Sequence, residues 1–132
     1  MFLSLAKART KPILRVDLPK NTTAVIGQNA SMRCIVVASG TLPDFRWLKW
    51  KTIPKGYPDN IVIENGSYVR LDSIYYLTID VGLSYGSELV IVNVTEDDFG
   101  LYTCHVGNHI GVDHRSAFLL KKVWPTVPGK IL

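Results

Sequence analysis

The segment DFGLYTC, residues 98–104, carries the strongest structural signal in this chain of 132 residues. Apolar side chains recur at every second position from Tyr102 through Cys104 to Val106, with polar residues between them. Successive side chains of a β-strand point to opposite faces of a sheet, so this spacing predicts a strand that turns Cys104 into a core. The preceding acids, up to Asp98, indicate a turn before that strand.

The chain has one other cysteine, Cys34, 70 positions earlier, and neither cysteine belongs to a CxxC or Cys/His ligand pattern. A pair this far apart in a small domain most simply bridges two distant strands, and closing so long a loop stabilises a fold by about 4 kcal/mol. Two separate buried thiols are the alternative. The spacing excludes a zinc ribbon or a redox motif.

Period-two patterns dominate the remaining chain and predict an all-β fold, without a helical repeat sustained over three turns. The first cysteine lies in a strand of about 30 to 37, and the next strand carries Phe45 and Trp47. Short edge pieces at 12–18 and 22–25 are separated by Pro19, which cannot donate to a central ladder. Further strands are expected around Leu89 and Ile91 and over 113–121, where Ala117 and Leu119 share a face, with weaker signals at 61–63 and 68–79.

Composition indicates a single globular domain, since 47% of residues are apolar and 20% are charged. We expect a linker at 1–11, the domain at 12–122 and a tail at 123–132. No apolar run approaches the roughly 20 residues that span a bilayer. The fragment is therefore expected neither to cross nor to contact a membrane, and a secretory signal would lie outside it. The net charge of +4 decides nothing about partners.

Four Asn-x-Ser/Thr acceptors, more than chance usually provides in a chain of this length, favour an extracellular, oxidising setting. The expected glycosylation sites are Asn21, Asn29, Asn65 and Asn93.

Taken together, Cys34, Trp47 thirteen residues later, and Tyr102 two residues before Cys104 resemble an immunoglobulin sandwich of the I-set. The resemblance implies two packed β-sheets, one inter-sheet disulfide beneath Trp47, and a tyrosine whose hydroxyl turns back onto the preceding corner, with Asp98 as a structural acid. These residues hold the fold and say nothing about what is bound.

A more specific resemblance is to the third immunoglobulin-like domain of fibroblast growth factor receptors, and it covers about residues 7 to 120. Its N-terminal part is KPIL at 11–14, LP at 18–19 and NTTAV at 21–25. The remainder is WLK at 47–49, NV at 93–94, DD at 97–98, YTC at 102–104, GN at 107–108, IG at 110–111 and SAFL at 116–119.

This resemblance implies an extracellular growth-factor-binding module of a single-pass receptor, on the outer side of the plasma membrane, with a tyrosine kinase outside this chain. Growth-factor binding would lead to receptor dimerisation and signalling. The ligand would contact the segments 7–11, 39–44 and 107–113. The contact residues expected there are Lys7, Arg9, Lys11, Gly40, Thr41, Leu42, Asn108, His109, Ile110 and Val112.

A preceding immunoglobulin domain and heparan sulfate are the other partners that the resemblance implies. The basic run Arg46, Lys49, Lys51 and Lys55 is a weak candidate for the sulfated chain, with a solvated strand and loop as its alternative. A structural adhesion module and a kinase-lacking decoy receptor are the alternative functions.

Other chemistries find no support in the sequence. His105, His109 and His114 fall within ten residues, but a spacing of four on a hairpin does not bring two imidazoles together, so no metal site is expected. No nucleophile elbow, phosphate-cradling loop or nucleic-acid recognition module occurs. We therefore expect a non-enzymatic chain without cofactors or nucleic-acid partners.

Overall fold

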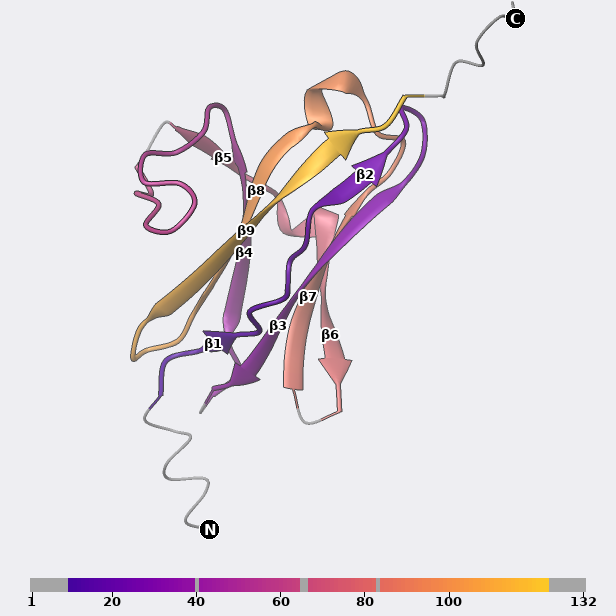
Figure 1. Ribbon diagram of the computed structural model, residues 1–132. Coiled ribbons are helices and arrows are strands. Elements are labelled where there is room, and N and C mark those ends of the chain that lie inside the picture. Colours follow the sequence, from indigo (N-terminus) through magenta and orange to yellow (C-terminus); the bar gives the residue numbers. More distant parts are fainter. Residues whose placement is uncertain (1–9, 40, 65–66, 83, 124–132) are drawn as a thin grey trace, which may run out of the picture.

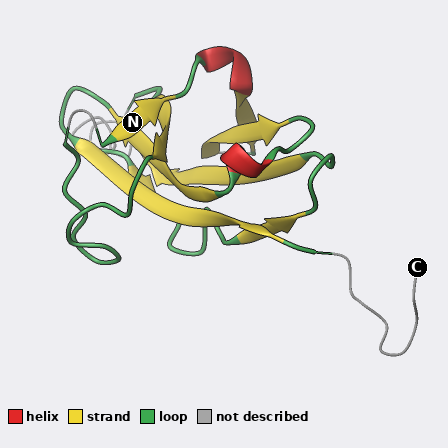
Figure 2. Cartoon of the chain, turned by 90° about the horizontal axis from the view of Figure 1, so that it is seen from above, coloured by secondary structure: helices red, strands yellow, loops and turns green. Residues whose placement is uncertain are grey.

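A computed structural model describes residues 10–39, 41–64, 67–82 and 84–123. It confirms a two-sheet β-sandwich, whose two layers are visible in Figure 1 and, from above, in Figure 2. One sheet has the order β1-β3-β7-β6 and the other the order β2-β9-β8-β4-β5. The strands are β1 (Ile13–Leu14), β2 (Thr22–Ala24), β3 (Ala30–Ala38), β4 (Asp44–Trp50), β5 (Tyr68–Arg70), β6 (Tyr76–Val81), β7 (Ser84–Ile91), β8 (Gly100–Gly107) and β9 (Val112–Lys121).

The predicted inter-sheet disulfide is present. Cys34 on β3 and Cys104 on β8 are bonded, with their Cα atoms 6.4 Å apart, and both are fully buried. Trp47 on β4 lies directly beside Cys104 in the sheet register and is also fully buried. Its indole Nε1 donates a 2.9 Å hydrogen bond to Ser87 Oγ on β7, the strand neighbour of Cys34. Two neighbouring links therefore connect the stacked sheets, namely the disulfide and this hydrogen bond.

The predicted tyrosine corner is confirmed as well. Tyr102 donates its hydroxyl to the Asp98 carbonyl at 2.5 Å. Asp98 ends the 3-10 helix η2 (Glu96–Asp98), and its Oδ2 accepts the Thr95 backbone N–H at 2.8 Å. Burial, and secondarily the nearby Asp98 carboxylate, raise the pKa of the Tyr102 hydroxyl, so it stays a protonated donor.

The region between Trp50 and β7 differs from the predicted pattern. Residues 61–63 form no strand. The expected strand at 68–79 is two strands on different sheets, because the chain crosses over through the 3-10 helix η1 (Ser73–Tyr75). The Asp72 carboxylate caps this turn by accepting the Ile74 backbone N–H at 3.2 Å. Side-chain capping of that kind competes with strand pairing and explains the interruption.

The edge pieces are also shorter than predicted and lie on opposite sheets. Within the 12–18 segment only β1 is a strand, and it pairs antiparallel with β3. The second piece, β2, pairs parallel with β9 in the other sheet. The expected linker and tail lie outside the described residues, apart from 10–11 and 123.

A second apolar cluster covers the outer face of the five-stranded sheet. Trp50 at the end of β4 is 3% exposed, although it points away from the inter-sheet core. Its Nε1 donates to Thr103 Oγ1 at 2.7 Å, and that hydroxyl lies 2.6 Å from Ser116 Oγ. The loop 51–64 covers this face, with Tyr57 packed edge-on against Phe118 at 5.7 Å between ring centroids. Alternation along β4 predicts burial of its inner face and does not predict this outer cluster.

Candidate functional site

The three segments expected to contact a ligand meet at one end of the sandwich. Ile13 pairs with Ala38, the last residue of β3, which places the N-terminal segment beside the β3–β4 loop. Asp44, the first residue of β4, pairs with Gly107, the last residue of β8, at the base of the β8–β9 turn. Figure 1 shows β1, the end of β3, the start of β4 and the β8–β9 turn in its lower part. The tertiary structure therefore assembles one surface from segments about 30 to 100 positions apart; below we call it the loop end.

Side-chain hydrogen bonds fasten the N-terminal segment to the β8–β9 hairpin. Asn108 Nδ2 donates to the Thr10 carbonyl at 2.7 Å, and Asp113 Oδ2 accepts the Leu14 backbone N–H at 2.9 Å. Between them Lys11 packs on Gly111, where a Cβ would lie 3.3 Å from the lysine Cβ. Only a glycine allows this close approach without a shift of its neighbour. These contacts hold segment and hairpin as one unit.

Asn108 serves mainly inside this unit. Its Oδ1 also accepts the backbone N–H groups of Ile110 at 2.8 Å and Gly111 at 3.2 Å, which shapes the turn. The side chain is half-buried. Asn108, expected as a contact residue, is therefore placed to position the turn and the N-terminal segment. Asp113 has the same kind of role, and sequence reasoning did not single it out because its partner, Leu14, is 99 positions away.

The side chains that face solvent at the loop end include three large apolar ones. Leu42 is 68% exposed, and Ile110 and Val112 are each 49% exposed. The exposed polar groups beside them are Lys11, Thr41, Asp44 and His109. Interfaces between proteins combine apolar anchors with a polar rim in this way. Lys7, Arg9 and Gly40, also expected as contacts, lie outside the described residues.

A row of ionisable groups crosses the outer face of the five-stranded sheet just behind the loop end. Arg46 on β4 pairs with His105 on β8, which pairs with His114 on β9. Burial, then the charges of His114 and Arg46, lower the pKa of His105, and only Asp44 opposes the shift. Asp44 Oδ2 lies 3.3 Å from Arg46 Nε. His105 is therefore neutral near pH 7.

The basic run expected to meet heparan sulfate is not gathered on one face. Arg46 points to the outer face, toward Asp44 and His105, whereas the Lys49 ammonium lies 5.5 Å from the centroid of the Tyr102 ring. Lys51 and Lys55 are exposed beyond the end of β4. Alternation along the strand therefore separates the first two charges, and only the last two share the 51–64 loop.

Three of the four expected glycosylation sites are described, and all three asparagines are exposed. Asn21 Oδ1 accepts the Phe118 backbone N–H, and Asn29 Oδ1 accepts that of Asn93, each at 2.9 Å. Asn65 lies outside the described residues.

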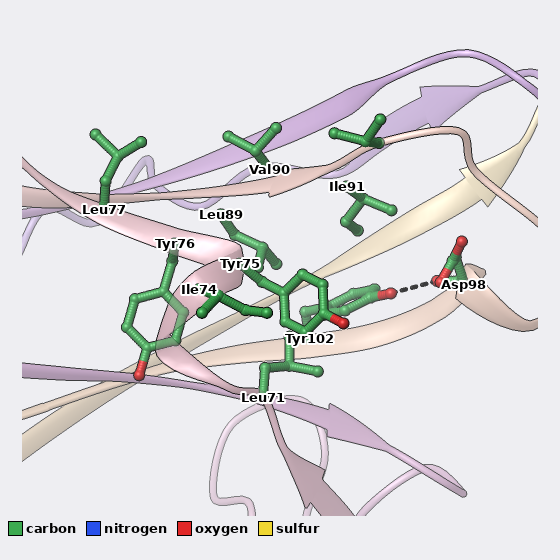
Figure 3. A pocket seen from close by; sticks show the side chains of 11 residues that line it. Leu71, Ile74, Tyr75, Tyr76, Leu77, Leu89, Val90, Ile91, Asp98 and Tyr102 are labelled. Atoms are coloured by element: carbon green, nitrogen blue, oxygen red, sulfur yellow. Dashed lines mark hydrogen bonds between the residues drawn. The ribbon is translucent and has the colours of Figure 1, made fainter.

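An apolar groove of about 640 Å³ opens near the other end of the sandwich, between η1, β7 and η2. Figure 3 shows Ile74 and Tyr75 of η1 on one side of it, Ile91 on the other, and Tyr102 with its bond to Asp98 at its base. The strand pattern over 68–79 does not predict this groove, because η1 interrupts that segment and forms one wall of it.

The described part of the chain contains no group of three or more His, Cys, Asp or Glu residues placed to hold a metal ion. Within the same residues, no helix has the length and apolar character that crossing a bilayer requires.

Comparison with known proteins agrees with this architecture. Residues 11–108 match the family described as "Immunoglobulin domain". Among solved structures, a chimeric titin Z1Z2 protein superimposes with a TM-score of 0.60 at 18% identity, covering 87% of this chain and 97% of that one. The twitchin kinase region of C. elegans superimposes with a TM-score of 0.55 at 23% identity, covering 88% of this chain and 17% of that one. These structures show a shared fold.

Two relatives are more informative about the subfamily. A fibroblast growth factor receptor of Halocynthia roretzi is 32% identical over 122 residues, which is 92% of this chain and 14% of that receptor. Fibroblast growth factor receptor 1 of Xenopus laevis is 35% identical over 115 residues, which is 83% of this chain and 13% of the receptor. The chain thus spans about one seventh of the length of the curated relatives it matches. This chain belongs to the immunoglobulin domain family and is a fibroblast growth factor receptor-like member of it.

Proposed function

We propose that this chain is a ligand-binding domain of a fibroblast growth factor receptor-type ectodomain, displayed outside the cell, and that its loop end contacts a growth factor. The observation that carries the proposal is the convergence of the N-terminal segment, the β3–β4 loop and the β8–β9 hairpin into one partly apolar surface. The similarity to receptors of this family, over most of the chain, supports the same role.

The contacts between segment and hairpin suit such a surface. Binding loses affinity when loops must be ordered at the moment of association, and a preorganised surface avoids that cost. The bonds from Asn108 to Thr10 and from Leu14 to Asp113 order the N-terminal segment before any partner arrives. A preceding immunoglobulin domain, continuing from this segment, would share the ligand with the loop end, so binding to the present chain alone should be weak.

The proposal is tested by surface plasmon resonance with the oxidised chain immobilised and a panel of fibroblast growth factors, with and without heparin. We expect weak, saturable binding. Leu42→Asp and Ile110→Asp should each lower the affinity at least about tenfold, because a charge replaces an apolar anchor at the contact. The matched control is Ile74→Asp, which places the same charge on a side chain 79% exposed at the groove, away from the loop end.

An absence of binding by the wild-type chain to every growth factor would overturn the proposal and favour a structural adhesion module. An equal loss in Ile74→Asp would move the contact away from the loop end. Faster association in the presence of heparin that is lost in Lys51→Ala/Lys55→Ala would assign the sulfated chain to the 51–64 loop. Decoy and kinase-bearing receptors share this domain, so the measurement applies to both.

A further inference from the structure

Two histidines that are nine residues apart in sequence lie side by side on the outer face of the five-stranded sheet. His105 on β8 and His114 on β9 are direct partners in the antiparallel register. The spacing of four between His105 and His109 does not bring those two imidazoles together on a hairpin. The hairpin instead pairs His105 with His114, while His109 lies exposed in the turn.

The register fixes the direction of both imidazoles. Thr103 and Ser116 are the partner residues two positions further along the same strands, and their hydroxyls lie 2.6 Å apart on the outer face. Because side chains alternate between faces, His105 and His114 project from that same face. Directly opposed residues of an antiparallel pair have Cβ atoms about 4.5–5.5 Å apart. Two imidazoles at that separation can reach one ion.

The surroundings leave room for such an ion. Both histidines are half-buried, so solvent reaches them. Each histidine borders a hollow of its own. One of about 380 Å³ is lined by His105, Asp44 and Arg46, and one of about 320 Å³ is lined by His114 together with Tyr57 and Asp59 of the 51–64 loop. The guanidinium of Arg46 is the one fixed positive charge in this row, and it is paired with the Asp44 carboxylate, which offsets its repulsion of a cation. Water would complete the coordination, because within the described residues no third His, Cys, Asp or Glu is placed to join the two histidines.

We propose that His105 and His114 form a two-nitrogen site for a divalent transition-metal ion. Imidazole suits zinc, copper and nickel, and among first-row divalent ions Cu²⁺ binds nitrogen ligands most tightly. A bound ion would link β8 to β9 two residues from the strand ends at Gly107 and Val112, and so hold the hairpin that carries Asn108 and Ile110. The site is distinct from the proposed growth-factor contact and does not depend on it.

The test is titration of the oxidised chain with Cu²⁺, followed by isothermal calorimetry and by electron paramagnetic resonance. We expect one ion per chain with hyperfine structure from two imidazole nitrogens. His105→Asn and His114→Asn should each weaken binding at least about tenfold and remove one nitrogen from the spectrum. The matched control is His109→Asn, which removes a histidine outside the proposed pair. It should leave the affinity and the spectrum unchanged.

A second readout separates loss of the site from loss of the fold. An ion that binds only the folded chain raises its unfolding temperature with increasing concentration. We expect this increase with Cu²⁺ and, more weakly, with Zn²⁺, in the wild type and in His109→Asn only. The proposal is overturned if the wild type takes up no ion at micromolar Cu²⁺, or if His105→Asn and His114→Asn, folded by circular dichroism, bind it as tightly as the wild type.

Discussion

Two tryptophans on one strand, Trp47 and Trp50, are both buried and both donate their indole N–H to a hydroxyl, yet they lie on opposite faces of the sheet. The bond from Trp47 reaches Ser87 across the sandwich, beside the disulfide. The bond from Trp50 reaches Thr103 on the neighbouring strand of the same sheet. The inner contact therefore joins two layers, whereas the outer contact only reinforces one layer.

The two sites also differ in what excludes water. Around Trp47 both sheets and the disulfide enclose the side chain, and its cluster includes Cys34, Cys104 and Leu89. Trp50 packs edge-on against Tyr68 of the edge strand β5, at 5.2 Å between ring centroids, and the 51–64 loop lies on the same outer face, with Tyr57 against Phe118. A loop has fewer packed neighbours than a sheet and opens at lower free-energy cost. Two equally buried side chains can thus contribute unequally to the free energy of unfolding.

The largest effect is expected from removing the disulfide between the two sheets. The variant Cys34→Ala/Cys104→Ala should lose about 4 kcal/mol of unfolding free energy, because its unfolded chain regains the freedom of a loop of 70 positions. Urea unfolding followed by tryptophan fluorescence measures this value against the wild type. A loss under about 1 kcal/mol would show that the sheets hold together without the bridge, and would remove the main distinction between the two faces.

The second test compares the two indole hydrogen bonds directly. Trp47→Phe and Trp50→Phe each remove a donor and should cost about 1–3 kcal/mol, as expected when a buried acceptor loses its partner. The loss should be larger for Trp47, because Thr103 keeps the Ser116 hydroxyl at 2.6 Å when Trp50 is replaced. The same urea experiment measures both. Equal losses, or a larger loss at Trp50, would contradict the ranking.

The third test weakens only the packing of the 51–64 loop on the outer face. Tyr57→Leu removes the edge-on aromatic pair with Phe118 and should cost about 0.5–1.5 kcal/mol. If the loop also shields Trp50, which is buried on the same outer face, the fluorescence of Trp50 should shift toward longer wavelength and its ring should become more accessible to acrylamide. The double variant Tyr57→Leu/Trp50→Phe assigns the signal. An unchanged spectrum would mean that the loop does not shield Trp50.

The smallest effect concerns pH and the outer face. The folded-state pKa of His105 is lowered, chiefly by burial, then by His114 and Arg46, while Asp44 opposes the shift. The histidine of the unfolded chain has an ordinary pKa of about 6.5 and takes up a proton at higher pH than the folded chain does. The stability that His105 contributes is therefore complete above that pH and declines as the pH falls from about 6.5 toward the folded-state pKa. Urea unfolding with a chelator present, between pH 7.5 and 5, measures the decline.

The variant His105→Gln should have a shallower decline over this range than the wild type. A matched replacement, His109→Gln, alters an exposed residue of the turn and should leave the slope unchanged. Identical slopes in all three proteins would exclude His105 as the titrating group.

Sequence reasoning was successful wherever a local pattern repeats along a strand. Alternation around Cys34, Trp47 and Cys104 predicted the inner faces of β3, β4 and β8, and the disulfide between them is present. It failed at 68–79, where Asp72 caps a 3-10 turn and the chain changes sheets. A capping hydrogen bond depends on one side chain and leaves no periodic trace.

The loop end was predicted as three separate segments. Their convergence follows from the fold, but the bonds that join Asn108 to Thr10 and Asp113 to Leu14 link residues 98 and 99 positions apart. The local sequence of neither segment predicts which distant residue it will bond. The pairing of His105 with His114 was missed for a related reason, since hairpin register depends on the turn that connects the strands.

By itself the sequence determined the class of the fold, the covalent link and the inner core, because strand periodicity and cysteine placement are properties of short segments. The tertiary structure decided which face the 51–64 loop covers, which segments share the loop end and which histidines are neighbours. Those outcomes depend on long-range packing, whose free energy depends on contacts between distant residues. A residue's local sequence contains little information about such contacts.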